Sequence, residues 1–281
     1  MKVAVVTDST SDIPKEIAKK YGITIVPLNV HFDLDTYQDG INITSEEFYK
    51  KLVSGKIFPT TSAPSSGIFL ETYKKLSENY DAIISIHVSS KTSATYNSAL
   101  QASKEIKIPI EVIDSKVVSA ALALIVIKIA TYVKSSNNIK SIKSHAESLI
   151  QRTTIFFSLE TLNFLIKGGR MGKAKGLIGS ILKIKPILTF DDGEVNVYER
   201  IRSKRKAIEK IHELASSFAP YEDTAVIYST DDTEPKKLGN LLQNFTKSKS
   251  VLSLQLGPVV GTYGGPNVIG FSGIKPDERD E

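Results

Sequence analysis

The chain has 281 residues, of which 41% are hydrophobic and 24% charged, and this globular composition suits one large domain or two of ordinary size. It contains no cysteine, which excludes disulfide bonds, thiolate metal sites and a cysteine nucleophile. The net charge of +5 is moderate and the four histidines lack metal-ligand spacing, so we expect no metal, no cofactor and no redox chemistry carried by the chain itself.

The first 115 residues alternate apolar runs with helical patterns. In chain order the apolar runs are residues 3–7, 23–32, 82–88 and 110–115, and the helical patterns are residues 12–22, 44–55, 66–80 and 92–106. Pro14 suits the first turn of the first helix and Gly22 its end, while Thr44 or Ser45 caps the second helix. Continuous Val and Ile runs separated by helices predict a parallel sheet with helices on both faces.

An unusually apolar stretch follows at residues 117–133. It is shorter than the ~20 residues that a membrane span needs, and Lys128 interrupts it. We therefore predict a buried helix. The start of the chain lacks the basic and apolar regions of a secretory signal, so we expect a cytoplasmic protein.

The sequence pattern changes in the second half of the chain, after a polar helix predicted at residues 139–151. Strand patterns occur at residues 154–160, 185–201, 224–230, 250–256 and 268–273. The sequence DDG at residues 191–193 indicates a hairpin turn within the second of these patterns. We predict an α/β protein with two domains: residues 1–160 with a parallel sheet, and residues 161–281 with a smaller, mixed sheet.

Four strand-to-helix turns are rich in hydroxyl groups: TDSTSDIP (residues 7–14), TTSAPSSG (60–67), SSKTSATY (89–96) and DSKVVSA (114–120). Turns after the carboxyl ends of parallel strands share one edge of the sheet, where ligands bind. Each turn alone is explained by helix capping, which needs one hydroxyl. Together the turns carry more hydroxyl groups than capping needs, which leaves a site for a carboxylate or phosphate as the alternative.

Two glycine-bearing segments lie in the second half. Residues 162–188 place Arg170 after a glycine pair, followed by helical apolar spacing at Leu177, Ile178, Ile181 and Leu182. Residues 256–273 carry glycines and prolines between apolar pairs. The backbone there can approach a ligand closely, or the segment is a tight β-turn region.

The standard catalytic signatures are absent, including the nucleophile elbow, zinc-protease, dinucleotide-binding and Walker motifs. This favours a binding protein over an enzyme acting alone. The alternative is a stand-alone hydrolase or phosphotransfer enzyme that uses Asp8 and the hydroxyl-rich turns. A third hypothesis, a nucleic-acid-binding regulator, depends on basic clusters at residues 170–185 and 201–210 but has no supporting motif, so we expect no nucleic acid.

Six segments in this order resemble the DegV family: VTDSTSDIP, TSAPSSG, SSKTSATYNSA, VIDSKVVSAALAL, GGRMGKAKGLIGSILKIKPIL and GPVVGTYGGPNVIGFSG. Several members of that family are fatty-acid-binding subunits of the bacterial fatty acid kinase. The resemblance implies a two-domain α/β protein that holds one long-chain fatty acid in a buried tunnel between its domains. It also implies a separate kinase subunit that uses ATP to phosphorylate the carboxylate, giving acyl phosphate for phospholipid synthesis.

The same resemblance assigns roles to residues of this chain. It implies that Thr61 and Ser93 bind the carboxylate and that Arg170 lies near it. Further ligand-binding residues by motif are Ser62, Thr95, Thr262, Tyr263, Gly264 and Gly265. The face offered to the kinase would carry Arg202, Lys204 and Lys206, and transient contact with a membrane surface is a further expectation.

Two departures from the family pattern bear on these roles. Tyr263 stands where the family commonly has histidine, and a phenol donates a hydrogen bond but is not cationic near neutral pH. Lys91 stands at a glycine of the family motif and is expected to place a charge near the tunnel mouth.

Overall fold

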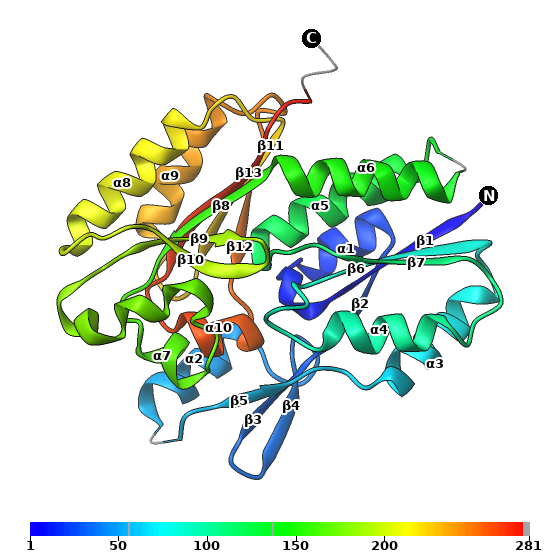
Figure 1. Cartoon of the computed structure of the whole chain (residues 1–281), viewed down its shortest axis with the longest axis horizontal. Helices are drawn as coiled ribbons and strands as arrows, with labels where there is room; N and C mark the ends of the chain where they lie inside the picture. The colour runs from blue at the N-terminus through cyan, green and yellow to red at the C-terminus, as the bar shows by residue number, and fades with distance from the viewer. Residues whose placement is uncertain (56, 137, 278–281) are drawn as a thin grey trace.

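The computed structural model describes residues 1–55, 57–136 and 138–277, apart from the side chains of residues 178–183 (Figure 1). Its first sheet is parallel, with strand order β2-β1-β6-β7. The bounds of these strands are β1 Val3–Asp8, β2 Ile23–Val26, β6 Ala82–His87 and β7 Ile110–Asp114. This confirms the parallel sheet predicted from the runs of Val and Ile.

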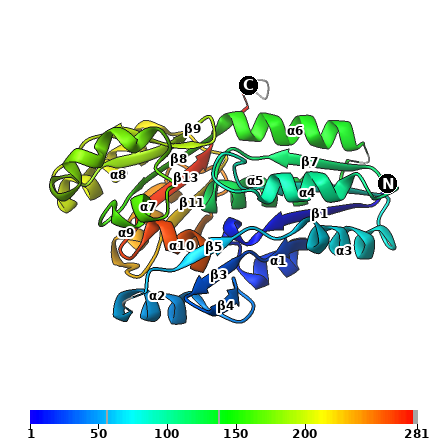
Figure 2. The same cartoon turned by 60° about the horizontal axis from the view of Figure 1, so that its bottom comes forward.

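Helices cover both faces of the parallel sheet (Figure 2). One face packs against α1 Lys15–Tyr21, α5 Ser119–Tyr132 and α6 Ile139–Arg152, and the other against α3 Ser66–Ser77 and α4 Thr95–Ser103. Alternate residues of β1 serve the two faces, since Val3 and Val5 pack with α5 whereas Ala4 and Val6 pack with α3 and α4. The short 3₁₀ turn η1 (Ser9–Ser11) follows β1.

The single strand predicted at residues 23–32 is wrong, because Pro27 divides it into two strands of different sheets. Strand β3 (Asn29–Phe32) pairs antiparallel with β4 (Asp35–Gln38) and β5 (Thr60–Ser62) in a small sheet that the sequence patterns did not predict. Proline removes a ladder donor, so a continuous strand is disfavoured there. Helix α2 (Ser45–Ser54) has the predicted Thr44 cap, with Glu47 completing a capping box.

The second sheet is mixed and has strand order β10-β9-β8-β13-β11-β12. Its strands are β8 Thr153–Ser158, β9 Ile187–Asp191, β10 Glu194–Glu199, β11 Asp223–Tyr228, β12 Val251–Gln255 and β13 Ile269–Ile274. The predicted hairpin turn joins β9 to β10, with positive φ at Asp192 (48°) and Gly193 (83°). Helices α8 (Lys204–Ser217) and α9 (Thr233–Gln243) pack against this sheet.

Helix α5 joins the two halves of the molecule. It contacts β1 and β6 of the parallel sheet and β8, β11 and β13 of the mixed sheet, so one hydrophobic core runs through both. Ten of its residues are buried, which confirms the buried helix predicted from residues 117–133. Within the described ranges, no helix has the length and apolar character needed to cross a membrane.

The expected boundary between residues 160 and 161 stays a prediction, although β8, which precedes it, pairs with strands of the mixed sheet. Of the two alternatives for the glycine-bearing segment at residues 256–273, the tight β-turn region is wrong near residue 260, because residues there form helix α10 (Pro258–Gly264) with proline in its first turn. The segment after α7 (Asn163–Lys167) is the 3₁₀ helix η2 (Gly172–Lys183). Leu177 is buried there, whereas the predicted apolar positions Ile178, Ile181 and Leu182 fall among the side chains outside the described part.

Candidate functional site

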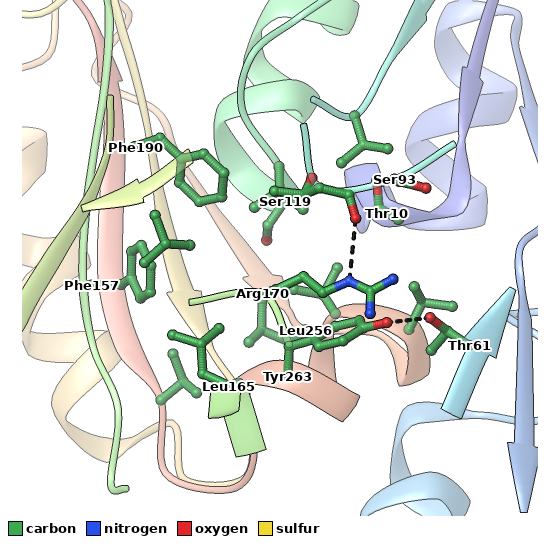
Figure 3. Close-up of a pocket in the computed structure, with 18 of the residues that line it drawn as sticks. Thr10, Thr61, Ser93, Ser119, Phe157, Leu165, Arg170, Phe190, Leu256 and Tyr263 are labelled. Carbon is green, nitrogen blue, oxygen red and sulfur yellow. Dashed lines mark hydrogen bonds between the residues drawn. The ribbon is translucent and has the colours of Figure 1, made fainter. Parts of the chain in front are cut away.

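A cavity of about 200 Å³ lies between the carboxyl edge of the parallel sheet, the mixed sheet and helix α10 (Figure 3). Its lining comes from both halves of the chain. Apolar side chains make up most of the wall: Leu28, Ala63, Val88, Val118, Ile155, Phe157, Leu159, Leu165, Phe190, Val195, Ile227, Leu256, Val259, Val260 and Val268. The cavity is therefore suited to a mainly apolar ligand.

The four hydroxyl-rich turns together contribute five lining hydroxyl residues: Thr10, Thr61, Thr92, Ser93 and Ser119. For three of the turns this follows from topology, because the turns after β1, β6 and β7 emerge at the same edge of a parallel sheet. Thr61 instead comes from β5 of the small antiparallel sheet. Several other hydroxyls of these turns do not line the cavity and bond elsewhere in the protein. Ser89, for example, donates to the carbonyl of Gly193 at 2.6 Å.

The hydrophilic end of the cavity is built by three side chains that are far apart in the sequence. The hydroxyls of Thr61 and Tyr263 share a hydrogen bond of 2.5 Å. The guanidinium carbon of Arg170 lies 4.9 Å from the centroid of the Tyr263 ring, in a cation–π arrangement. Arg170 also donates to the carbonyls of Thr92 at 3.3 Å and Gly168 at 2.5 Å, which anchors the cation beside the two hydroxyls (Figure 3).

The glycine pair before Arg170 has a packing reason. A Cβ on Gly168 would lie 2.3 Å from the Tyr263 ring, so only glycine lets the ring lie against this backbone. Gly169 has a φ of +72°, a conformation that side-chain-bearing residues rarely adopt. The two glycines therefore let the chain turn after α7 and place Arg170 over Tyr263.

Five of the predicted ligand-binding residues line the cavity: Thr61, Ser93, Arg170, Tyr263 and Gly264. The other four lie elsewhere. Ser62 is exposed and bonds to Asn29 and His31, and Thr95 is buried and bonds to Ser93. Thr262 donates to the carbonyl of Pro258 within α10, and Gly265 lies against the ring of Phe164.

The residues predicted to face a partner, Arg202, Lys204 and Lys206, are all exposed at the start of α8. Lys204 forms an ion pair of 3.1 Å with Glu160. Lys91 is also exposed, and its ammonium group lies 2.6 Å from a carboxylate oxygen of Asp192 on the β9–β10 turn. Hydrogen bonds from Lys91 and Lys116 lower the pKa of Asp192 to about 2, so this carboxylate stays ionised between two cations.

Asp8, the candidate catalytic group, is fully buried and does not line the cavity. Its carboxylate accepts from Thr10 and from the N–H of Val88, and lies 2.9 Å from Nδ1 of His87. Nε2 of His87 lies 2.7 Å from the hydroxyl of Ser85, which also bonds to Tyr73. The hydrogen bonds among Asp8, His87 and Ser85 have the connectivity of a catalytic triad, but all three residues are buried and none lines the cavity.

Two buried carboxyls behind the cavity were not singled out by sequence reasoning. Asp12 accepts the N–H of Gly257 at 2.8 Å, and a Cβ on Gly257 would lie 3.1 Å from Asp39. Burial raises the pKa of Asp12 well above its ordinary value and that of Asp39 to about 7. In the sequence, Asp12 lies in a turn just before a helix, a position that helix capping explains. Asp39 comes close to Gly257 only through the tertiary fold.

The sequence profile of the DegV family matches residues 2–275. The chain belongs to the DegV family. Among curated proteins, a DegV domain-containing protein of Halalkalibacterium halodurans is 38% identical over 278 residues, covering 96% of this chain and 98% of the relative. The DegV protein of Bacillus subtilis is 34% identical over 277 residues, covering 96% and 98%.

Solved structures of DegV proteins superpose along almost the whole chain. A fatty-acid-binding DegV family protein from Thermus thermophilus has a TM-score of 0.90 at 30% identity and covers 98% of this chain and 100% of its own. DegV of Bacillus subtilis, described as a fatty acid binding protein, has a TM-score of 0.89 at 34% identity with the same coverage. A stearic-acid-binding protein from Eubacterium ventriosum has a TM-score of 0.88 at 26% identity and covers 97% and 98%. These comparisons establish the α/β fold of this chain.

Over the described parts of the chain, no group of three or more His, Cys, Asp or Glu side chains is arranged to hold a metal ion.

Proposed function

We propose that this DegV protein binds one long-chain fatty acid in the cavity, with the carboxylate at Thr61, Ser93, Arg170 and Tyr263. One observation carries the proposal: a single, mostly apolar cavity ends at a cation and a set of hydroxyl donors. A fatty acid has the same division into an anionic head and an apolar tail. Binding of fatty acids by the Thermus thermophilus and Bacillus subtilis relatives supports the proposal.

Tail and head make different contributions to binding. Burying a chain of ~16 carbons at ~0.8 kcal/mol per methylene contributes about 12 kcal/mol before entropy costs. A hydrogen bond to a carboxylate contributes ~1.5–3 kcal/mol. The tail therefore supplies most of the affinity. The hydroxyls of Thr61 and Tyr263 bond to each other, and a carboxylate bound there accepts a hydrogen bond from each hydroxyl in place of that bond.

The proposal extends to a carrier role in a kinase system. The bound carboxylate is presented to a separate kinase subunit, where a carboxylate oxygen attacks the γ-phosphorus of ATP, ADP leaves and an acyl phosphate forms. Arg170 is exposed and provides the cation beside the head, since a phenol such as that of Tyr263 carries no positive charge. Arg202, Lys204 and Lys206 form the docking face, and fatty acid is exchanged by transient contact with a membrane surface.

Native mass spectrometry of protein purified from bacterial cells tests the binding proposal. We expect one added mass that matches a long-chain fatty acid and is lost on denaturation. Thr61→Val with Ser93→Ala should lower the retained fraction, whereas Ser62→Ala, next to Thr61 but outside the cavity, should leave it unchanged. An empty protein, or a polar ligand in its place, would refute the proposal.

Acyl phosphate formation with ATP and the ATP-binding subunit of a bacterial fatty acid kinase tests the carrier role. Charge reversal of Arg202 and Lys206 to Glu should abolish the reaction while fatty acid binding persists. The matched control reverses two exposed cations of α3, Lys74 and Lys75. Equal rates for the two double variants would exclude the proposed docking face, and acyl phosphate made without any kinase subunit would favour the enzyme alternative.

A further inference from the structure

A polar pocket adjoins the hydrophilic end of the cavity. It has a volume of about 480 Å³ and is formed by the turn after β6, the glycine-bearing turn after α7, the start of η2 and the first residue of β10. Four residues line both spaces: Thr92, Ser93, Ala94 and Arg170. Figure 3 shows two of them, Ser93 and Arg170, at the same end of the cavity as Thr61. The pocket and the cavity therefore meet at the proposed carboxylate position.

The lining of this pocket differs in chemistry from that of the cavity. Three of its side chains carry a positive charge, Lys91, Arg170 and Lys175, against one carboxylate, that of Glu194. Apart from Ala94 and two glycines, the described residues of its wall are polar or charged. This excess of positive charge suits an anion and not a hydrocarbon chain.

Ion pairs around the pocket do not cancel this positive charge. Lys91 lies 2.6 Å from one oxygen of Asp192, and Lys116 lies 2.9 Å from the other oxygen of the same carboxylate. Asp192 therefore keeps a cation when the exposed side chain of Lys91 turns toward the pocket. Among the described side chains, no carboxylate forms an ion pair with Arg170 or with the exposed Lys175.

Charge balance distinguishes the two spaces. Arg170 is the one charged side chain among the described residues that line the cavity, and it matches the single negative charge of a carboxylate. In an acyl phosphate the oxygens on that carbon are an uncharged carbonyl and a bridging oxygen. The charge lies farther out, on a phosphoryl group that carries about two negative charges near neutral pH. Phosphorylation thus moves the charge away from the apolar tail, toward the side on which the pocket lies.

We propose that this pocket is a phosphoryl subsite, in which Lys91 and Lys175 bind the phosphoryl group of a bound acyl phosphate. This inference rests on the proposed function and deepens it, because it assigns residues to the product that the carrier would hold after transfer. The acyl tail stays in the cavity throughout. Arg170 lies between the two spaces, where it contacts the carboxylate before transfer and the phosphoryl group afterwards.

Dissociation constants of delipidated protein for two ligands with the same tail test the subsite. One ligand is palmitate, and the other is the β-ketophosphonate analogue of palmitoyl phosphate, in which a methylene replaces the bridging oxygen. The ratio of the two constants isolates the phosphoryl group, because changes in tail binding or in folding affect both ligands. Physiological ionic strength screens distant surface charges.

Each of Lys91→Met and Lys175→Met should weaken the phosphonate about tenfold relative to palmitate, because each removes one charge-assisted hydrogen bond, and the double variant should weaken it about a hundredfold. Lys173→Met is the matched control, since Lys173 is an exposed cation of η2 that does not line the pocket and pairs with Asp191. It should keep the wild-type ratio. A ratio that is the same in wild type and double variant, or a wild type that binds palmitate but not the phosphonate, overturns the subsite and leaves fatty acid binding standing. Failure of the wild type to bind palmitate overturns both.

Phosphorus nuclear magnetic resonance separates an attached phosphoryl group from free phosphate as the occupant. We expect the bound phosphonate to titrate at a lower pH than the free phosphonate in the wild type, and this difference to shrink in the double variant. Inorganic phosphate added to palmitate-loaded protein should give no bound signal, because it lacks the tail that supplies most of the affinity. A saturable phosphate signal that the double variant loses would assign the pocket to a free anion and overturn the assignment to acyl phosphate.

Discussion

Substitution of Asp39 by asparagine tests how the buried carboxyls hold helix α10. Asp39 is 5% exposed, and its carboxyl lies beside the first turn of α10, where Asp12 accepts the N–H of Gly257. Burial is the main cause that raises the pKa of Asp39 from 3.8 to about 7, with a smaller effect of the charge on Asp8. Asp12 and Tyr49 are the other titratable groups that face this cluster.

The pKa of Asp39 gives the sign and size of its effect on how stability changes with pH. A carboxyl whose pKa is higher in the folded state binds its proton more tightly there, so the free energy of unfolding falls as pH rises from about 4 to about 7. One pKa unit corresponds to ~1.4 kcal/mol, so Asp39 alone lowers the free energy of unfolding by about 4 kcal/mol across that window. Above the window its contribution is constant.

Urea unfolding of wild type and Asp39→Asn at a series of pH values between 4 and 8, followed by circular dichroism, measures this contribution. Asparagine resembles the neutral carboxyl in shape but does not titrate. The free energy of unfolding of the variant should therefore fall much less as pH rises. Near pH 8 it should be higher than that of the wild type. Asp33→Asn, on an exposed turn, is the control and should keep the wild-type slope. Parallel curves for wild type and Asp39→Asn would refute the reasoning.

Three further predictions concern the hydrophilic end of the cavity and the β9–β10 hairpin. Gly168→Ala should displace the ring of Tyr263 and lower fatty acid affinity about tenfold in a calorimetric titration, whereas Gly176→Ala, with open space around it, should not. Tyr263→Phe removes one donor to the carboxylate and should weaken palmitate binding by roughly tenfold to a hundredfold; an unchanged affinity would contradict a role of the phenol. Lys91→Met should raise the carboxyl pKa of Asp192 above its value of about 2, as measured by nuclear magnetic resonance titration, and a constant pKa would mean that Lys91 is not its main partner.

Local patterns predicted those parts of the molecule whose causes are local. The capping box of Thr44, the positive-φ hairpin turn at Asp192 and Gly193, and the buried helix of residues 117–133 all follow from short stretches of sequence. The hydroxyl-rich turns at the edge of the parallel sheet were also predictable, because parallel topology brings such turns together. Pro27 is the exception, since the apolar pattern of residues 23–32 predicts one strand and the proline divides it into two.

Non-local contacts decided which of the candidate residues face the cavity. Thr61 and Ser62 are adjacent in a strand, where neighbouring side chains point to opposite sides, and the pairing of β5 with β3 decides that Thr61 faces inward. Gly168 and Tyr263 are nearly a hundred residues apart, and only their packing explains why the first must be glycine.

The sequence by itself determined the alternation of strands and helices, the hydroxyl-rich edge and membership of the DegV family, because periodicity, turn chemistry and ordered motifs are written along the chain. Tertiary structure alone decided the rest. Burial of Asp12 and Asp39 against α10, and the contact of Gly168 with the ring of Tyr263, depend on which segments meet in space. A side chain's solvation and neighbours come from that meeting, and they set both a carboxyl's pKa and which end of a cavity is polar.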